Sequence, residues 1–472
     1  MKFCFLINDA PFLSEFFGKI CKLVLEDKHE AVVVVNNKIA EYTKKQFFPS
    51  KTKFISKVDW CIANFNPAKK EFENLSWREF FPDFCRFRRL QWNYQYAVDT
   101  VSQLYQFFDF VFQNEKPDVL IGEPPAGLFG EIGYYFAKKN SVPFLGFVDS
   151  AFNLALYDSE WTDSRFEKTF KGLSDGDISE RERESFPARI EKFISHAQQP
   201  NFIKYVRISF GQFELLRHYL RKMPELKSLF KYFMGRKKFQ QYDYESEVDL
   251  RRSIVAPFEV EMRQFRLLFQ KRFFFRINEQ DQFFLYPLHL EPEASTLILA
   301  APYSDQLATI KNIAFSLPFP CKLYVKEHPV AMGSRHDSFY QTLQKIPNVV
   351  LISANQNVPE LVRKSLGMVT LTGTMGMEAA LAGKPVYVLG KVFYTYHPLC
   401  RKVQNFDDLK EQIKTDLSKK PDTKNLENIN IRFMASYIRN TLKGGIIYAT
   451  EVQDKNDYKM IYGGIKQRIG NV

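Results

Sequence analysis

Two short motifs in the second half of the chain contain residue types suited to chemistry on a phosphorylated substrate. The first is Lys-Glu-His-Pro at residues 326–329, which follows the apolar run Leu-Tyr-Val. The second is Thr-Gly-Thr at residues 372–374, four residues before Glu378. Histidine and lysine donate hydrogen bonds to phosphate oxygens, and a glycine turn lets backbone N–H groups approach an anion. Together the motifs indicate an anion site.

The Thr-Gly-Thr motif predicts a strand that ends near Leu371, a bend at Gly373 and a helix that starts near Thr374. The free N–H groups of a helix N-terminus favour phosphate. Glu378 comes about one turn later, where a carboxylate accepts hydrogen bonds from sugar hydroxyls beside the phosphate. The alternative is a structural turn followed by a solvent-facing glutamate.

His328 also has two interpretations. One is a histidine in the core, held by the backbone. The other is a hydrogen-bond donor to phosphate, in a turn fixed by Pro329. The charged Lys326 and Glu327 precede it, so burial is not expected here. Lys326 either adds positive charge to the site or pairs with Glu327, and Arg335 is a further candidate phosphate contact.

Short apolar runs that alternate with helical patterns predict βαβ units on a parallel sheet, where ligands lie outside the carboxyl ends of the strands. In this second domain we expect strands at 282–287, 321–325, 348–352, a run ending near 371, and 386–390. Helices are expected at 305–317, 358–365, from 374, and at 407–418 and 430–442. The aromatic loop 390–397 either lines a sugar pocket or lies on the surface.

The first half predicts a separate open α/β domain. Strands are expected at 2–7, 31–35, 117–123 and 143–148, and helices at 12–26, 91–114 and 127–139, while 36–87 reads as irregular with short helices. Glu123 falls in a loop at a carboxyl end, where a general base for an acceptor hydroxyl belongs. A helix-capping role is the alternative for Glu123. Asp149, at the next strand end, is a weaker candidate base.

The length and the net charge of the chain limit the possible domain organisation and partners. A chain of 472 residues exceeds one ordinary core, so we expect domains at 1–280 and 281–440, with a tail, 441–472, that crosses back to the first. The net charge of +12 suggests anionic partners. A basic helical insertion at about 160–276 either meets anionic lipid or glycan, or packs as solvated helices.

The cysteines and the hydropathy pattern point to one compartment. The six cysteines form no Cys-x-x-Cys pair, and the seven histidines form no metal-binding pattern, so we expect buried thiols and no metal site. No signal peptide and no uncharged run of about 20 residues is present. The expected location is cytoplasmic, with any membrane contact peripheral, on the inner face of the cytoplasmic membrane.

An ordered series of motifs between residues 283 and 390 resembles the bacterial capsular polysaccharide synthesis family, which includes the capsule Kdo transferases. It comprises Tyr-Pro-Leu-His at 286–289, Pro-Glu-Ala-Ser-Thr at 292–296, Tyr-Val-Lys-Glu-His-Pro at 324–329, Gly-Ser-Arg at 333–335, Pro-Asn-Val at 347–349, Thr-Gly-Thr at 372–374 with Glu-Ala at 378–379, and Gly-Lys-Pro-Val at 383–386. The resemblance implies a GT-B-like fold, with two Rossmann-like domains facing a central cleft. The His-Pro pair is also similar to that of bacterial sialyltransferases, where it serves the CMP part of the donor.

The resemblance implies a metal-independent GT-B glycosyltransferase of surface polysaccharide synthesis that needs no cofactor. The preferred donor is a CMP-activated ulosonic acid of the Kdo or nonulosonic kind. The alternatives are a UDP-hexose donor, a non-catalytic polyanion-binding assembly factor, and a nucleotide-sugar epimerase. Expected partners are the nucleotide sugar and a glycan or glycolipid acceptor, but not nucleic acid. The catalytic candidates are Glu123, His289 and His328, and the donor-binding candidates are Lys326, His328, Pro329, Arg335, Thr372, Gly373, Thr374 and Glu378.

Overall fold

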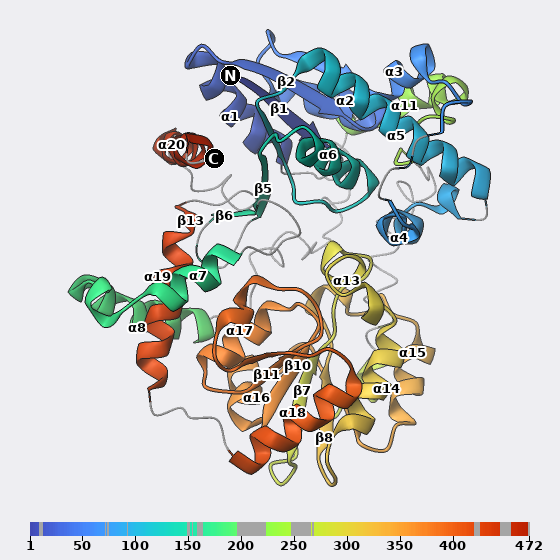
Figure 1. Cartoon of the computed structure of the whole chain (residues 1–472). Helices are drawn as coiled ribbons and strands as arrows, with labels where there is room; N and C mark the ends of the chain where they lie inside the picture. Colours follow the sequence, from blue (N-terminus) through green and yellow to red (C-terminus); the bar gives the residue numbers. More distant parts are fainter. Residues whose placement is uncertain are drawn as a thin grey trace. The chain divides into compact units, whose positions relative to one another are not determined.

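The computed structural model describes residues 1–8, 13–70, 72, 75–91, 93–148, 152, 154–157, 164–195, 223–246, 266, 269–419, 425–443 and 455–470. The chain forms two compact units, each drawn from separate stretches of sequence (Figure 1). The first unit comprises Met1–Trp161, Ser209–Ile254 and Thr441–Val472, and the second comprises Thr162–Ile208 and Val255–Asn440. Two separate α/β domains are therefore confirmed, as predicted for a GT-B-like protein.

The first unit is built on a seven-stranded sheet in the order β13-β6-β5-β4-β1-β2-β3. Strands β1 to β5 pair in parallel, while β6 and β13 pair antiparallel at one edge. The strands are β1 (Lys2–Ile7), β2 (Glu30–Val35), β3 (Lys53–Ser56), β4 (Val119–Gly122), β5 (Phe144–Val148), β6 (Leu154–Tyr157) and β13 (Thr441–Leu442). The helices are α1 (Leu13–Glu26), α2 (Lys38–Lys44), α3 (Lys57–Asn64), α4 (Trp77–Arg86), α5 (Tyr94–Glu115), α6 (Leu128–Lys139), α11 (Met223–Phe239) and α20 (Lys455–Gly470).

Alternation along β1 distributes its side chains between two cores. Phe3 and Phe5 pack with α1 and α20 on one face, while Cys4 and Leu6 pack with α5 and α6 on the other. Successive side chains of a strand point to opposite faces, so an unbroken apolar run marks a strand that is covered on both sides. This explains why β1 and β2 carry no polar residue in their centres.

The second unit is built on a six-stranded parallel sheet in the order β12-β11-β10-β7-β8-β9. The strands are β7 (Phe283–Pro287), β8 (Lys322–Lys326), β9 (Val349–Ile352), β10 (Gly367–Thr370), β11 (Val386–Val388) and β12 (Cys400–Lys402). The helices are α7 (Ser164–Gly172), α8 (Glu180–Ser195), α13 (Ala294–Leu297), α14 (Gln306–Ser316), α15 (Asp337–Gln344), α16 (Val358–Lys364), α17 (Thr374–Leu381), α18 (Phe406–Lys419) and α19 (Leu426–Arg439). One core joins this sheet to α14, α15 and α18.

Helices α7 and α8 correct the predicted domain boundaries, because they belong to the second unit rather than to an insertion in the first. Phe166 of α7 is fully buried and stacks on Tyr396, with ring centroids 6.2 Å apart. Its carbonyl accepts a hydrogen bond of 2.5 Å from the Ser436 hydroxyl of α19. Arg439 of α19 donates to the Asp177 carbonyl at 2.6 Å. Long-range packing onto α19 therefore places α7 and α8 in the second unit.

Some predicted elements end elsewhere in the structure. The helix expected at 430–442 ends at Arg439 as α19, and the chain then forms β13 at the edge of the first sheet. The short strands β3, β6, β12 and β13 were not predicted, and each of them lies in the outer part of its sheet and not at the centre. Of the basic segment, residues 196–222 and most of 247–268 lie outside the described residues.

Five of the six cysteines, Cys4, Cys21, Cys61, Cys321 and Cys400, are buried thiols, as predicted, and Cys85 is half-buried. Within the described part of the chain, no helix is both long enough and apolar enough to cross a bilayer. Within that same part, no cluster of three or more His, Cys, Asp or Glu side chains is arranged to hold a metal ion.

Candidate functional site

The predicted site residues of the second unit converge at one edge of its sheet. Strand β7 lies between β8 and β10, so the loops that follow these three parallel strands meet at their carboxyl ends. These loops carry His289, His328 and the turn at 372–374. The chain runs outward from β7 to β9 on one side and from β10 to β12 on the other. The switch point between β7 and β10 is where open α/β sheets bind ligands.

His289 connects these loops through its ring and its backbone. Its Nε2 accepts a hydrogen bond from the Thr372 N–H at 3.2 Å. Its backbone is held by Gln306, which accepts from the His289 N–H at 2.8 Å and donates to the carbonyl at 2.9 Å. The side chain is only 6% exposed, and burial lowers the pKa of His289 to about 3.

A neutral imidazole whose Nε2 accepts a hydrogen bond carries its proton on Nδ1. His289 therefore holds the Thr372–Gly373 turn in place as a positioning residue. Its Nδ1 has no hydrogen-bond partner among the described residues, so the catalytic role predicted for His289 stays a prediction.

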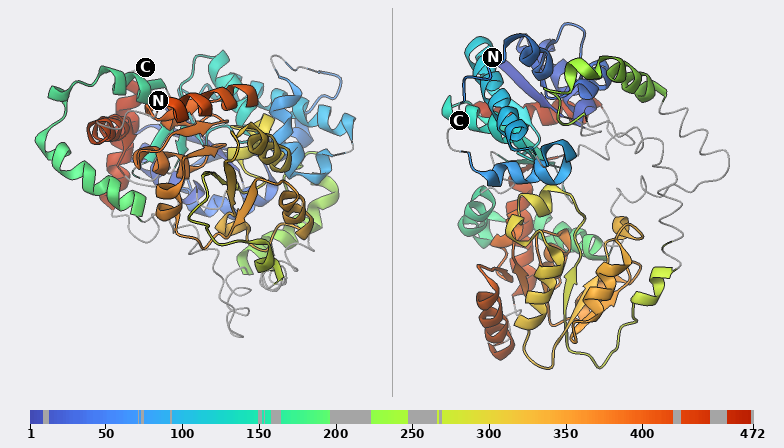
Figure 2. Two further views of the ribbon diagram at one scale, coloured as in Figure 1. Left: turned by 90° about the horizontal axis from the view of Figure 1, so that it is seen from below. Right: turned by 90° about the vertical axis from the view of Figure 1, so that its right-hand side faces the viewer.

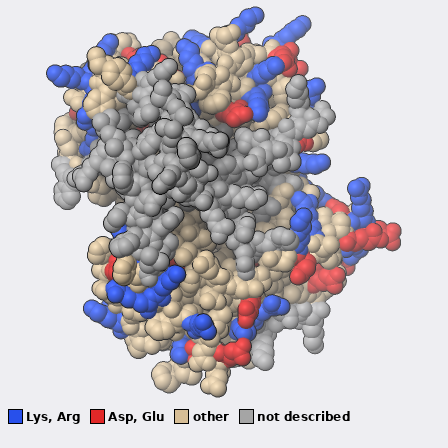
Figure 3. Space-filling model, turned by 180° about the vertical axis from the view of Figure 1, so that it is seen from behind, with Lys and Arg blue, Asp and Glu red and all other residues tan. Residues whose placement is uncertain are grey.

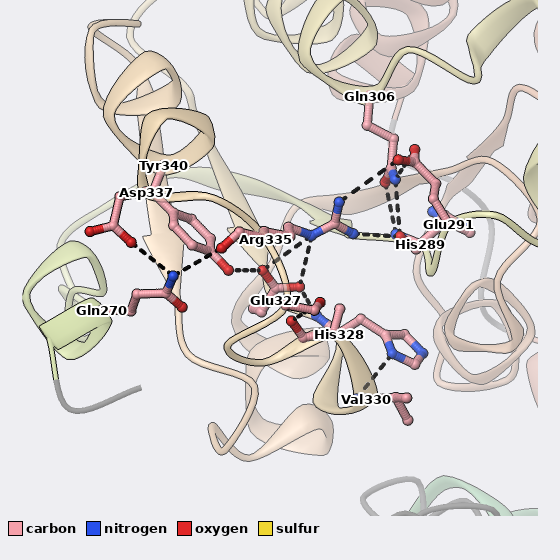
Figure 4. Close-up of polar contacts among 12 residues, drawn as sticks. Gln270, His289, Glu291, Gln306, Glu327, His328, Val330, Arg335, Asp337 and Tyr340 are labelled. Carbon is pink, nitrogen blue, oxygen red and sulfur yellow. Dashed lines mark hydrogen bonds and ion pairs between the residues drawn. The ribbon is translucent and has the colours of Figure 1, made fainter. Parts of the chain in front are cut away.

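Glu327 and Arg335 form a buried network behind His328 (Figure 4). Glu327, which is 1% exposed, accepts hydrogen bonds from the Tyr340 hydroxyl at 2.6 Å and the His328 N–H at 2.6 Å. Arg335 Nε lies 3.4 Å from Glu327, and its Nη2 donates to the His289 carbonyl at 2.6 Å. These contacts use two of the nitrogens of a guanidinium that has five N–H donors, so the predicted phosphate contact of Arg335 stays a prediction.

His328 is the side chain of this group with a ring nitrogen turned away from the network. It is half-buried, and its Nδ1 accepts a hydrogen bond from the Val330 N–H at 3.2 Å in the turn that Pro329 begins. Burial and the nearby charges of Lys326 and Arg335 lower the pKa of His328 to about 4. The neutral ring therefore carries its proton on Nε2, which points away from Glu327 and Arg335 in Figure 4.

Lys326 and Glu378 are both buried, and the burial of Lys326 is contrary to the expectation that the strand end at 326–328 is exposed. Lys326 is 2% exposed and donates from Nζ to the Ala354 carbonyl at 2.8 Å, and burial lowers its pKa to about 8. Glu378 is 5% exposed, and burial raises its pKa to about 8, against the opposing charge of Lys326. Its Oε2 has no hydrogen-bond partner among the described residues. Glu378 is therefore not the solvent-facing glutamate of the structural alternative.

The turn before α17 has the predicted form. Gly373 is the N-cap of α17, its N–H donates to the Thr370 hydroxyl at 3.1 Å, and no side chain caps the helix. The Tyr394 hydroxyl donates to the Gly373 carbonyl at 2.6 Å from the loop 390–397. Tyr394, Tyr396 and His397 are all buried, which excludes an aromatic surface loop. The loop supports the turn from behind and leaves the helix N-terminus uncapped.

Glu123 lies at the corresponding switch point of the first unit, between β1 and β4. It follows β4, is half-buried, and its Oε2 accepts a hydrogen bond from Asn8 Nδ2 at 3.1 Å. Burial raises its pKa, against the effects of Asn8 and Arg86. A carboxylate with a raised pKa is a better general base than an ordinary surface carboxylate. The weaker candidate, Asp149, lies outside the described residues.

Sequence reasoning did not identify the supporting residues Gln306, Tyr340 and Tyr394. Gln306 and Tyr340 lie on helices and act across sequence separations of 17 and 13 residues. No local pattern marks such contacts. Only Tyr394 had a signal, since it stands in an aromatic loop already expected near the same sheet edge.

Comparisons with solved structures give distant likenesses, two over nearly the whole chain and one over 69% of it. The chain has 12% identity to S. aureus MnaA in a co-structure with UDP, at a TM-score of 0.31, covering 100% of this chain and 97% of that one. It has 12% identity to Neisseria meningitidis UDP-GlcNAc 2-epimerase bound to UDP-GlcNAc, at a TM-score of 0.30, covering 99% and 100%. It has 12% identity to Thermosulfurimonas dismutans KpsC, a β-Kdo 2,7-transferase, at a TM-score of 0.31, covering 69% and 79%. Likenesses this distant carry no information on activity.

A search of curated proteins gave no significant match. A protein family, in contrast, matches a continuous stretch of the sequence. The family described as capsule polysaccharide biosynthesis protein matches residues 180–438, more than half of the chain. This stretch contains β7 to β12 and all the candidate residues of the second unit. The chain therefore belongs to the capsule polysaccharide biosynthesis protein family.

Proposed function

We propose that this protein is a glycosyltransferase of bacterial surface polysaccharide synthesis whose second unit binds a nucleotide-sugar donor. One observation carries the proposal. A neutral histidine with its Nε2 proton turned outward and an uncapped helix N-terminus lie at the same edge of one parallel sheet. Both groups donate hydrogen bonds, and both suit a phosphate that gains charge as it leaves.

The residues then have distinct roles. His328 donates from Nε2 to a phosphate oxygen of the leaving nucleotide, and the N–H groups at Thr374 bind the same phosphate. Glu378, with a carboxyl oxygen that no described group contacts, accepts from the ribose hydroxyls. Lys326 contributes positive charge from beneath the site. Glu123 of the first unit stays the candidate base for the acceptor hydroxyl.

The preferred donor is a CMP-activated ulosonic acid, because the His-Pro pair at 328–329 is similar to that of CMP-sugar enzymes. A UDP-hexose is the alternative donor. A non-catalytic polyanion-binding factor would keep the fold without binding any nucleotide, and an epimerase would convert a nucleotide sugar without an acceptor.

The first prediction is that CMP stabilises the protein more than UMP or UDP does. A ligand at about 100 times its dissociation constant stabilises the folded state by about 2.7 kcal/mol, so a thermal-shift series detects the preference. A larger shift with UDP would overturn the CMP assignment and favour a hexosyltransferase. If no nucleotide shifts the melting temperature, the donor site itself is wrong.

The second prediction concerns turnover. His328→Ala removes a donor that strengthens in the transition state, and we expect kcat to fall by about 10²–10³ with donor binding less affected. His336→Ala is the control, because His336 is exposed on the same unit, and the melting curves account for the loss of its capping hydrogen bond from the Ser338 N–H at the start of α15. Steady-state kinetics with melting curves make the comparison. Full activity in His328→Ala would show that this histidine does not contact the leaving group.

A further inference from the structure

Helix α11 of the first unit has one face packed on the domain and one face in solvent. Tyr232 is 1% exposed and lies with its ring 6.0 Å from that of Phe239. Lys38 Nζ of α2 lies 5.4 Å from the Phe239 ring centroid, and Lys231 Nζ lies 4.1 Å from the centroid of Tyr42, also on α2. These contacts fix the rotation of α11 on α2, so the residues on its outer face are defined.

The outer face is apolar along its centre. Phe230 is 69% exposed, Phe233 is 37% exposed and Met234 is 77% exposed. Residues three and four apart lie on the same side of a helix, so these three side chains form one strip. Leaving large apolar side chains in water is unfavourable. Several exposed apolar side chains in one patch therefore indicate an interaction site more strongly than a single exposed side chain does.

Basic residues border this strip on both sides. At 100° per residue, Lys231 and Lys238 fall on one side of Phe230 and Met234, and Arg236 falls on the other. Lys237 falls within the strip itself. All four cations are exposed. Lys231 lies over the Tyr42 ring of α2, and the Arg236 guanidinium lies 5.6 Å from the Phe233 ring centroid. Long basic side chains that border an apolar strip are typical of helices that lie in a membrane interface.

Charge alone does not single out α11, because Lys and Arg side chains are spread over the described surface of both units (Figure 3). Exposed apolar residues alone do not single out α11 either, since Phe319 in the second unit is 100% exposed. The combination on α11 is what matters: a central apolar strip with cations on both borders, on a helix at the periphery of its unit (Figure 2).

We infer that α11 binds the surface of an anionic membrane, with Phe230, Phe233 and Met234 inserted at the headgroup level. The cations on both borders complement lipid phosphates and acidic headgroups, which cover a plane on both sides of such a helix. An apolar strip about one side chain wide fits the shallow insertion of an interfacial helix. This inference concerns a different surface from the donor site and does not depend on the donor's identity.

The test is co-sedimentation of the full chain with vesicles. One set is phosphatidylcholine alone, and the other is an equimolar mixture of phosphatidylcholine and phosphatidylglycerol. We expect binding to the mixed vesicles, little to the neutral ones, and weaker binding as salt rises. Lys237→Gln with Lys238→Gln should lower the partition coefficient about 30-fold, since each cation near an anionic surface contributes about a fivefold gain.

Phe230→Ser with Met234→Ser should lower binding by about tenfold or more, because both side chains lose their apolar burial in the interface. Two controls are matched in chemistry and lie on the second unit: Phe319→Ser, and Lys410→Gln with Lys414→Gln on the exposed side of α18. Both controls should bind like the unmodified protein. Equal binding to the two vesicle sets, no binding to either, or equal losses in the controls would each overturn the inference. Nucleotide-induced thermal shifts should be the same in all these variants.

Discussion

At the scale of single residues, burial changes the chemistry of the charged groups around the donor site. Glu378 and Lys326 both have their pKa values moved to about 8, by the same cause acting on opposite charges. Burial disfavours the charged form of each, and their attraction opposes it only in part. Both groups therefore change their protonation state near pH 8 instead of in their ordinary ranges.

The pH dependence of stability tests the burial of Glu378. Its pKa is raised in the folded state, so it adds stability that is complete below about pH 4.5 and is lost as the pH rises toward 8. Glu378→Gln cannot titrate. We expect its unfolding free energy to vary less between pH 5 and 7, by a slope difference approaching about 1.4 kcal/mol per pH unit.

Urea unfolding at several pH values measures this slope. Glu411→Gln on α18 is the control, because that carboxyl is exposed and should leave the pH profile unchanged. Parallel profiles for the unmodified protein and Glu378→Gln would mean that the carboxyl is not buried in solution.

At the scale of elements, α17 depends on a small residue in its first turn. A Cβ at Gly376 would lie 2.4 Å from the Tyr394 hydroxyl and 3.0 Å from Thr370 Cγ2. Real atoms do not approach so closely, so either the helix or Tyr394 must move. That movement would disturb the hydrogen bond from the Tyr394 hydroxyl to the Gly373 carbonyl, which supports the turn.

We therefore expect Gly376→Ala to destabilise the protein by about 1–3 kcal/mol, as overpacked cores do, and to weaken nucleotide binding. Gly172→Ala on α7 is the control, because a Cβ there meets nothing within 4 Å. That change should be neutral or slightly stabilising, since alanine loses less entropy in a helix than glycine does. Melting curves with and without CMP separate the two effects, and an unaltered CMP shift in Gly376→Ala would show that the turn does not bind the nucleotide.

At the scale of the whole molecule, the chain passes four times between its two units. Residues 162–208 belong to the second unit, residues 209–254 to the first and residues 255–440 to the second, and residues 441–472 then return to the first. The returning segment contributes Tyr458, Ile461, Tyr462 and Ile465 to the same core as β1 and α1. Neither unit is therefore a continuous stretch of sequence, and a cut at any single position leaves one of them incomplete.

Ile461→Ala tests this contribution. Ile461 is fully buried, and truncating such a side chain typically costs about 2–5 kcal/mol. The four tryptophans all belong to the segment 1–161, so tryptophan fluorescence during urea unfolding reports on the first unit. Met460→Ala is the control, because Met460 is 47% exposed. If the fluorescence transition of Ile461→Ala matches that of the control, α20 is not part of this core.

The sequence by itself determined the elements that depend on neighbouring residues. The apolar runs of β1, β2, β7 and β8 carry no charge at their centres, and their identity as covered parallel strands follows directly. The bend at Gly373 and the start of α17 one residue later are equally local. The convergence of His328 and this turn on one sheet edge followed from the geometry of parallel strands.

Only the tertiary structure decided which polar groups face a ligand and which are used internally. Arg335 and His289 have the residue types of a phosphate site, yet Arg335 Nε pairs with Glu327 and His289 Nε2 accepts from the Thr372 N–H. Glu378 is buried, which no local pattern in the sequence indicated. The physical reason is the range of the contacts. A strand or turn is specified within a few residues, whereas burial and hydrogen-bond partners come from segments far away in the chain, whose placement no local pattern encodes.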